Sequence, residues 1–191
     1  MSFLAFANGP LLPASRRGFL KSSGLLLSGT AVALLAGRES LAAGGNATEA
    51  DARILNTALA AELEAVAAYQ VGAESGLLQK PALDLAITFQ GHHREHADVL
   101  AKTIEKLGGR PVGAKARYDF PTAKLKNQAD VLRFAAALEK GAVSAYLGAV
   151  PVFANRDLAK AAASILGDEA MHWAILRQAV GEVPVPSAFV A

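Results

Sequence analysis

Residues 165–176 read Ile-Leu-Gly-Asp-Glu-Ala-Met-His-Trp-Ala-Ile-Leu and set a carboxylate and an imidazole three positions apart in an apolar frame. On a helix, positions i and i+3 lie on the same face, so Glu169 and His172 are expected to point together into the core. A buried carboxylate and a buried imidazole each need a partner there, because removing them from water is costly. A metal ion is a partner that suits both side chains.

A near-copy of this stretch lies earlier in the chain, at residues 89–100, which read Phe-Gln-Gly-His-His-Arg-Glu-His-Ala-Asp-Val-Leu. His96 aligns with His172 at an offset of 76 residues. A second motif, Glu-x-x-Ala-Val-x-Ala-Tyr, begins at Glu62 and again at Glu139, at an offset of 77 residues. Two unrelated segments that repeat at nearly one offset indicate a duplicated unit of two helices.

The first 43 residues are interpreted as an export signal. Residues 15–21 read Ser-Arg-Arg-Gly-Phe-Leu-Lys, a twin-arginine motif, and an uncharged run over residues 22–37 is followed by small residues up to Ala43. We expect a signal peptide over residues 1–43, one domain over residues 44–191, and a periplasmic location. An uncleaved membrane anchor is the alternative, but the run is shorter than the ~20 apolar residues that span a bilayer.

Composition narrows the class of protein. Residues 1–43 hold four of the 19 basic residues and one of the 17 acidic residues, so 15 basic and 16 acidic residues remain beyond them. This balance gives no support for a nucleic-acid partner. The sequence has no cysteine, which excludes thiolate chemistry and suits an oxidising compartment.

Helical periodicity predicts an all-α protein of four helices. Capping and breaking residues place them from Thr48 to Gly72–Gly76, from Pro81 to Gly108, from Asn127 to Pro151, and from Asn155 to about Val180. Thr48 is expected to cap the first helix, with Asp51 at its third position. Residues 108–126 have no helical period and are longer than most connections between helices. We therefore predict a four-helix bundle, built from two helix pairs, with one long crossover between the second and third helices.

Superposition of the two halves gives an inward-facing set of metal-ligand candidates: Glu62, His93, His96, Glu139, Glu169 and His172. Bundles that hold two metal ions use one Glu from each of two helices and Glu-x-x-His from each of the other two. The chain thus resembles the ferritin-like superfamily, and within it the rubrerythrin-type and secreted ferritin-like proteins. The resemblance extends from about Thr48 to Val180.

The resemblance implies a role for each matching residue. It makes Glu62 and Glu139 terminal carboxylate ligands, Glu169 a bridging carboxylate, and His96 and His172 the histidine ligands; these positions match the family pattern. It also implies that Tyr69 and Tyr146, which we consider as catalytic candidates, hydrogen-bond near the site. Each tyrosine lies seven residues after a terminal glutamate and hence on the same side of its helix. Packing of the two rings in the core is the alternative.

His93 departs from the pattern, because it stands where the first half should offer a bridging Glu. A neutral imidazole has one lone pair for a metal ion and cannot bridge two ions. Three glutamates also leave two divalent ions one charge short of neutral. An unsymmetric metal pair, a single ion and a metal-free polar core all remain open. His92 lies four residues before His96 and could join it on one ion, but it is expected at the rim, and Glu95 is expected on the surface.

The first functional hypothesis is an exported protein that binds one or two iron or manganese ions and reacts with oxygen or peroxide. Because no cysteine could form a rubredoxin-like site, electrons would come from an external donor. The second hypothesis is a metal-free helical module that binds a partner or protects against stress. Iron storage would need a cage of many subunits, and the sequence leaves both a homo-oligomer and enzymatic turnover open. A membrane partner is expected only through an uncleaved signal.

Overall fold

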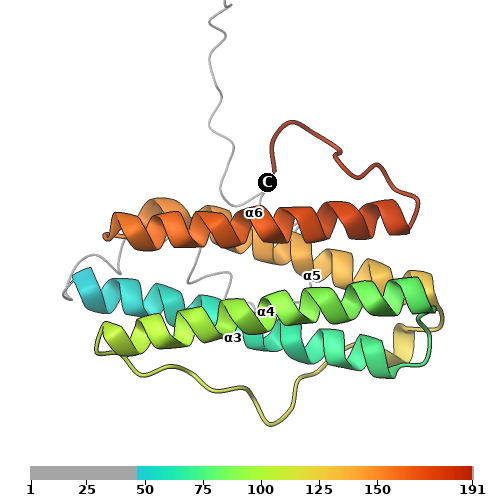
Figure 1. Ribbon diagram of the computed structural model, residues 1–191, viewed down its shortest axis with the longest axis horizontal. Helices are drawn as coiled ribbons and strands as arrows, with labels where there is room; N and C mark the ends of the chain where they lie inside the picture. Colours follow the sequence, from blue (N-terminus) through green and yellow to red (C-terminus); the bar gives the residue numbers. More distant parts are fainter. Residues whose placement is uncertain (1–46, 191) are drawn as a thin grey trace, which may run out of the picture.

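The computed structural model describes residues 47–190, and the regular structure in this range is helical. Four long helices form one bundle (Figure 1): α3 (Ala47–Glu74), α4 (Lys80–Lys106), α5 (Gln128–Ala149) and α6 (Arg156–Ala179). Helix α3 packs on α4 and α5 packs on α6, and the two pairs meet mainly through α3 and α5. The predicted bundle of two helix pairs is confirmed, whereas the predicted signal over residues 1–43 lies outside the described residues.

The predicted helix ends are set by the expected local chemistry. Pro81 lies in the first turn of α4, where its missing N–H leaves no helical hydrogen bond unmade. The side chains of Asn127 and Asn155 cap α5 and α6 by accepting a backbone N–H from the first turn. Gly108 follows α4 with a φ of +77°, a conformation that glycine adopts without a Cβ clash. Within residues 47–190, no helix is long and apolar enough to cross a membrane.

The N-terminal part of α3 differs from the expectation. Thr48 lies inside α3, which begins at Ala47, so it is not the N-cap residue that the sequence predicted. Instead the buried Asp51 carboxylate accepts the backbone N–H groups of Ala154 and Asn155, each at 2.9 Å. These residues join the 3-10 turn η3 (Val150–Val152) to α6. Asp51 therefore ties the first helix to the start of the last.

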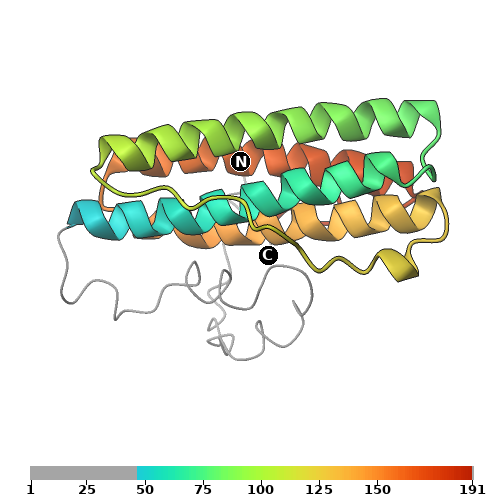
Figure 2. The ribbon, with the colours of Figure 1, turned by 90° about the horizontal axis from the view of Figure 1, so that it is seen from below.

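A long crossover joins the two helix pairs, as predicted. It runs from the end of α4 to the start of α5 along the outside of the bundle, past α3, and includes the short turn η2 (Thr122–Lys124) (Figure 2). The side-chain amide of Asn56 on α3 holds it, donating to the Arg110 carbonyl at 3.0 Å and accepting the Val112 N–H at 2.8 Å. The crossover thus makes hydrogen bonds of its own to the helix that it passes.

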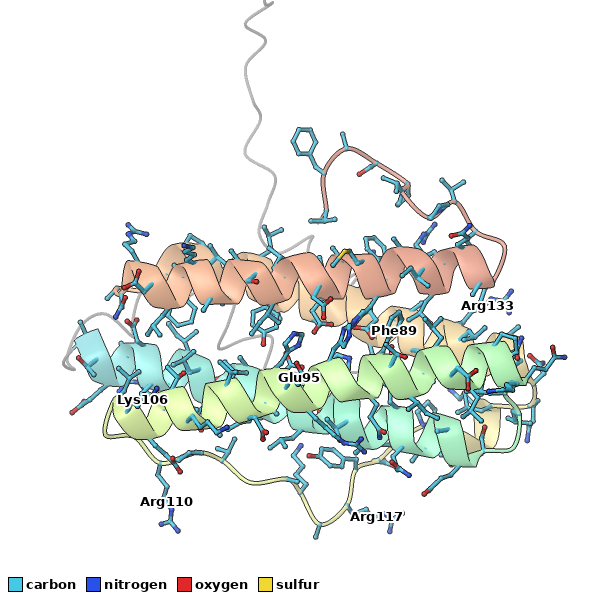
Figure 3. All side chains as sticks on the ribbon, viewed as in Figure 1. Phe89, Glu95, Lys106, Arg110, Arg117 and Arg133 are labelled. Carbon is cyan, nitrogen blue, oxygen red and sulfur yellow. The ribbon has the colours of Figure 1, made fainter. Side chains whose placement is uncertain are left out.

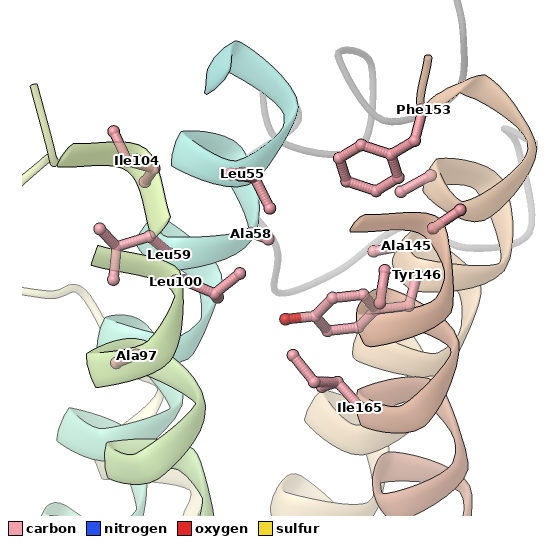
Figure 4. Close-up of a cluster of buried hydrophobic side chains, with 13 residues drawn as sticks. Leu55, Ala58, Leu59, Ala97, Leu100, Ile104, Ala145, Tyr146, Phe153 and Ile165 are labelled. Atoms are coloured by element: carbon pink, nitrogen blue, oxygen red, sulfur yellow. The ribbon is translucent and has the colours of Figure 1, made fainter. Parts of the chain in front are cut away.

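Two apolar clusters fill the two ends of the bundle. The first contains Leu55, Leu59, Leu100, Ile104 and Phe153, and Figure 4 shows these side chains with Tyr146 among them. The second, at the opposite end, contains Tyr69, Phe89, Leu132 and Leu176. Burial of each large apolar side chain stabilises the folded state by roughly 1.5–3 kcal/mol. These contributions offset the cost of a polar layer between the clusters.

Candidate metal centre

A layer of acidic and imidazole side chains lies between the two apolar clusters. It brings together all six candidates from the sequence: Glu62 from α3, His93 and His96 from α4, Glu139 from α5, and Glu169 and His172 from α6. His96 is partly exposed, and the other five residues are at most 3 % exposed. Figure 3 shows ring and carboxylate side chains filling the space between α4 and α6. The predicted proximity is therefore observed, while the ligand roles stay a prediction.

Glu169 occupies the centre of this layer, and its two oxygens face different histidines. Oε1 lies 3.2 Å from Nδ1 of His96, and Oε2 lies 3.7 Å from Nδ1 of His172. The carboxylate thus has one oxygen directed to each half of the cluster. This is the arrangement that a carboxylate shared by two metal ions needs.

Two further glutamates complete the two halves. Oε2 of Glu62 lies 3.6 Å from Nδ1 of His96, and Oε1 of Glu139 lies 3.6 Å from Nδ1 of His172. With Glu169 and His93 shared, each half has four side chains whose ligand atoms lie within 4.8 Å of one another. The cluster therefore offers two neighbouring positions for a cation, one beside each Nδ1 atom.

Several buried atoms of this cluster have no hydrogen-bond partner. Among the described residues they are Nδ1 of His96, Nδ1 of His172, both oxygens of Glu169 and Oε2 of Glu139. Buried polar atoms nearly always make a hydrogen bond, so five atoms without one in a single layer need an explanation. Carboxylates and imidazoles together are a ligand set that binds iron or manganese. The residues present fit such ions.

The charges of the cluster favour a cation. Burial lowers the pKa of an imidazole, but Glu169 and Glu62 outweigh it and raise the pKa of His96 to about 9. Glu139 and Glu169 likewise raise the pKa of His172 to about 9 against the effect of burial. Burial, and then Glu139, raise the pKa of Glu169 itself to about 7. The carboxylates therefore attract positive charge, which either protons or a metal ion can supply.

His93 stands between the two terminal glutamates. Its Nδ1 lies 2.8 Å from Oε2 of Glu62, and its Nε2 lies 3.3 Å from Oε1 of Glu139. Although burial lowers the pKa of His93, hydrogen bonds to Glu139 and Glu62 raise it to about 11. The imidazole thus spans the place where a fourth carboxylate was expected and pairs with the other carboxylates instead.

The two tyrosines cross between the halves of the repeat. The Tyr146 hydroxyl on α5 donates to Oε1 of Glu62 on α3 at 2.6 Å, and the Tyr69 hydroxyl on α3 donates to Oε1 of Glu139 on α5. Burial and the neighbouring carboxylates raise the pKa of both hydroxyl groups well above its ordinary value, so both stay protonated. Each tyrosine thus orients the terminal glutamate of the other half. The catalytic role suggested for them stays a prediction.

One residue of the site, Asp168, was missed by the sequence prediction, and a second, His92, was expected only at the rim. Oδ2 of Asp168 lies 3.2 Å from Nε2 of His172 and 3.5 Å from Nε2 of His96, so one carboxylate faces the outer nitrogen of both rings. Such a contact fixes a ring with its other nitrogen directed inward. His92 is at the rim as expected, yet its Nδ1 reaches Asp168 at 3.0 Å. The repeat, which aligns His92 with Asp168, was the signal that could have identified the pair.

The opposite side of the cluster has an apolar approach. A cavity of about 20 Å³ lies between α3 and α5 and reaches Glu62, His93 and Glu139. The rest of its lining is mostly alanine, including Ala61 and Ala142. Glu95, labelled on α4 in Figure 3, is exposed and away from the cluster, as the sequence predicted.

The fold and the site define a class of protein, the four-helix bundles that hold carboxylates and histidines in their core. Within this class the chain belongs to the ferritin-like domain family, which it matches over residues 50–182. The resemblance inferred from the sequence is thereby confirmed.

Two solved structures have a similar fold. A conserved hypothetical protein from Mycobacterium tuberculosis has 24% sequence identity and a TM-score of 0.65, over 75% of this chain and 99% of that chain. A ferritin-like, diiron-carboxylate protein from Bacillus anthracis str. Ames has 20% identity and a TM-score of 0.62, over 72% and 99% of the two chains. At these identities the similarity concerns the fold alone. No curated protein matches the chain.

Proposed function

We propose that this chain is an exported ferritin-like protein that binds two iron or manganese ions at the buried cluster and reacts with oxygen or peroxide. The observation that carries the proposal is the set of five buried atoms around Glu169 that have no hydrogen-bond partner. Glu62, His96 and Glu169 would hold one ion, and Glu139, His172 and Glu169 the other. The solved relative described as a diiron-carboxylate protein supports this choice of metal chemistry.

When bound, such ions supply one-electron chemistry toward oxygen or peroxide. The protein's own part is to hold the ligands in place and to keep the site dry. Tyr69 and Tyr146 hold the terminal glutamates through their hydroxyl groups, and the apolar clusters exclude bulk water from both ends of the site. The chain has no cysteine to carry electrons to the site, so turnover needs an external donor.

The alanine-lined cavity favours a small, neutral molecule as the oxidant. It approaches Glu62 and Glu139 from the side opposite to Asp168, and most of the other residues that line it are alanines. An uncharged molecule as small as oxygen or peroxide pays little desolvation cost in such a cavity, whereas an anion pays much more. A cavity volume of about 20 Å³ gives room for a molecule about the size of water.

A metal-free module that binds a partner is the second candidate, and His93 is the observation that favours it. His93 pairs with two glutamates at 2.8 and 3.3 Å, and a buried network of this kind can stabilise a core without any metal ion. The two candidates differ in whether the purified protein retains metal. In the first candidate the polar layer binds metal ions, and in the second it is a hydrogen-bonded part of the core.

Elemental analysis distinguishes the candidates. The protein is expressed with both iron and manganese supplied, purified without chelators and analysed by mass spectrometry for metal content. We expect close to two ions per chain. One ion per chain would indicate an unsymmetric site. A chain without metal, whose melting temperature neither metal raises, would make the partner-binding module the leading account.

Export is a separate part of the proposal and rests on the twin-arginine motif at residues 15–21. Replacement of Arg16 and Arg17 by lysine keeps the charge and removes the pair that the export machinery recognises. We expect the wild-type protein in the periplasmic fraction and the Lys-Lys variant in the cytoplasmic fraction. Equal export of both would refute this part and leave the metal site unaffected.

A further inference from the structure

A second group of candidate ligand atoms lies on the outer side of His172. Nδ1 of His92 is 3.0 Å from Oδ2 of Asp168 and 2.9 Å from Nε2 of His172, and the last two atoms are 3.2 Å apart. The side chains of His92 and Asp168 are 42% and 21% exposed, whereas His172 is buried. These three residues, the outer group, therefore connect solvent to the buried cluster.

The distances between these three atoms match those between neighbouring ligands of one metal ion. Two ligands at right angles and ~2.1 Å from a divalent ion are about 3 Å apart, so three atoms at such distances can form one face of an octahedron. Two imidazoles and one carboxylate suit Fe²⁺, Mn²⁺, Co²⁺ or Zn²⁺ better than Mg²⁺ or Ca²⁺. The exposure of His92 leaves the remaining positions of the ion to water.

His172 links the outer group to the buried cluster, because its two nitrogens face opposite ways. Nδ1 lies 3.6 Å from Oε1 of Glu139 in the cluster, and Nε2 belongs to the outer group. His96 is arranged in the same sense, with Nδ1 near Glu169 at 3.2 Å and Nε2 near Asp168 at 3.5 Å. A neutral imidazole has one lone pair and binds one ion at a time. An ion at the outer group and an ion on Nδ1 of His172 therefore exclude each other.

The helices leave this side of the bundle more open than the opposite side. Helices α3 and α5 make more close backbone contacts than α4 and α6 do, in keeping with the alanines between them. Between α4 and α6 lie instead aromatic and imidazole rings: Phe89, labelled in Figure 3, stacks on His172 with ring centroids 3.9 Å apart, and the centroids of His92 and His172 are 5.1 Å apart. The polar approach to the cluster thus lies between α4 and α6.

We propose that the outer group is the capture site through which divalent metal ions reach the buried cluster. An ion binds first to His92, Asp168 and Nε2 of His172, and then moves between the rings of His96 and His172 to their Nδ1 atoms. The inference rests on the proposed function, because it requires the buried cluster to bind metal. His92 belongs to the outer group alone, so it serves loading and not retention.

The test compares the rate of metal binding and the final number of bound ions between the wild type and two variants. The full chain, free of chelator, is mixed with Co²⁺ in a stopped-flow instrument, and the visible absorption of the bound ion is followed. The test variant is His92→Ala, and the matched control is Glu95→Ala, an exposed charged residue on the same helix. Loss of a capture site is expected to slow loading at sub-saturating Co²⁺ by about tenfold or more. The final number of ions bound should stay that of the wild type.

A second variant keeps the inference testable if His92→Ala alters packing. Asp168→Asn retains the shape of the side chain but removes the charge shared by both rings, so loading should slow and the final affinity should fall by about 10–100-fold. Wild-type loading rates in His92→Ala would overturn the inference while leaving the proposed function intact. A His92→Ala variant that binds fewer ions would also overturn it, because His92 would then be a permanent ligand. A wild-type chain that binds no Co²⁺ would instead refute the proposed function itself.

Discussion

Replacement of Glu169 by Gln is the sharpest test of the ligand assignment. The side chain is fully buried, and both of its oxygens lack a hydrogen-bond partner while facing His96 and His172. Glu169→Gln keeps the shape of the residue and removes the charge that both cation positions share. We expect the variant to fold and to lose its stabilisation by metal.

The expected stabilisation by metal can be calculated because metal binding and folding are linked equilibria. An ion that binds only the folded state and is present at 100 times its dissociation constant stabilises that state by about 2.7 kcal/mol. In a domain of this size 1 kcal/mol raises the melting temperature by roughly 2–4 °C, so each ion should raise it by about 5–10 °C. With two ions the wild-type gain is about twice that, and in Glu169→Gln it should be close to zero.

When a chelator removes metal, Glu169→Gln should no longer lower the stability of the protein and should leave it unchanged or raise it. Burial and Glu139 raise the pKa of Glu169 from 4.5 to about 7, so its ionised form opposes folding, and stability falls as the pH rises through this range. Glutamine does not ionise, so at pH 8 in chelator the variant should melt at the same temperature as the wild type or higher. A merely packing role for Glu169 would give a lower temperature under both conditions.

The assay is thermal unfolding at pH 8 with excess Mn²⁺ and with chelator, for the wild type, Glu169→Gln and an exposed control, Glu95→Gln. The control should keep the full response to Mn²⁺, because Glu95 lies away from the cluster. A Glu169→Gln variant that still gained 10 °C or more from Mn²⁺ would refute the ligand assignment.

Four further predictions concern the residues of this centre and the Asp51 contact between α3 and the start of α6. Tyr146→Phe should lower the free energy of unfolding by about 1.5–3 kcal/mol in urea titrations, since it removes the hydroxyl that donates to Glu62; no change would contradict the pairing. Co²⁺ affinity should rise as the pH rises toward 9, because the ion must displace protons from His96 and His172, whose pKa values are about 9; titrations at pH 6 to 9 would show this. When a chelator removes metal, the free energy of unfolding should instead fall as the pH rises. The raised pKa values of His96 and His172 add stability below pH 6.5, and this stability is lost as the pH passes 9, which urea unfolding at pH 6 and 10 measures. Asp51→Asn should cost about 1–3 kcal/mol of unfolding free energy and leave metal content unchanged, because one of the two backbone N–H groups at the start of α6 loses its acceptor.

The sequence predicted the bundle well because its signals are local and occur twice. Asn127 and Asn155 mark the two helix starts where the structure has them, and the offset of 77 residues between Glu62 and Glu139 places both on the core side of their helices. The six candidates also meet as predicted, since helical spacing fixes which side chains share a face.

The contacts between helices could not be read from the sequence in the same way. Spacing placed each tyrosine on the side of its own glutamate, but the structure pairs Tyr69 with Glu139 and Tyr146 with Glu62. Asp51 was assigned to its own helix end and instead serves α6, more than 100 residues further along the chain. Such partners depend on how the helices are rotated against one another, and a single sequence does not give this angle.

The crossed tyrosines have a consequence for how this chain could have arisen. Because each half supplies the hydroxyl that holds the other half's glutamate, one helix pair alone leaves its own glutamate without that donor. Two identical pairs assembled as a symmetric dimer would satisfy both glutamates, but every substitution would then occur twice. Fusion into one chain removes this constraint, so one half can carry His92 and His93 at the positions where the other half carries Asp168 and Glu169. An unsymmetric polar core of this kind is therefore possible in a fused chain and impossible in a symmetric dimer of identical helix pairs.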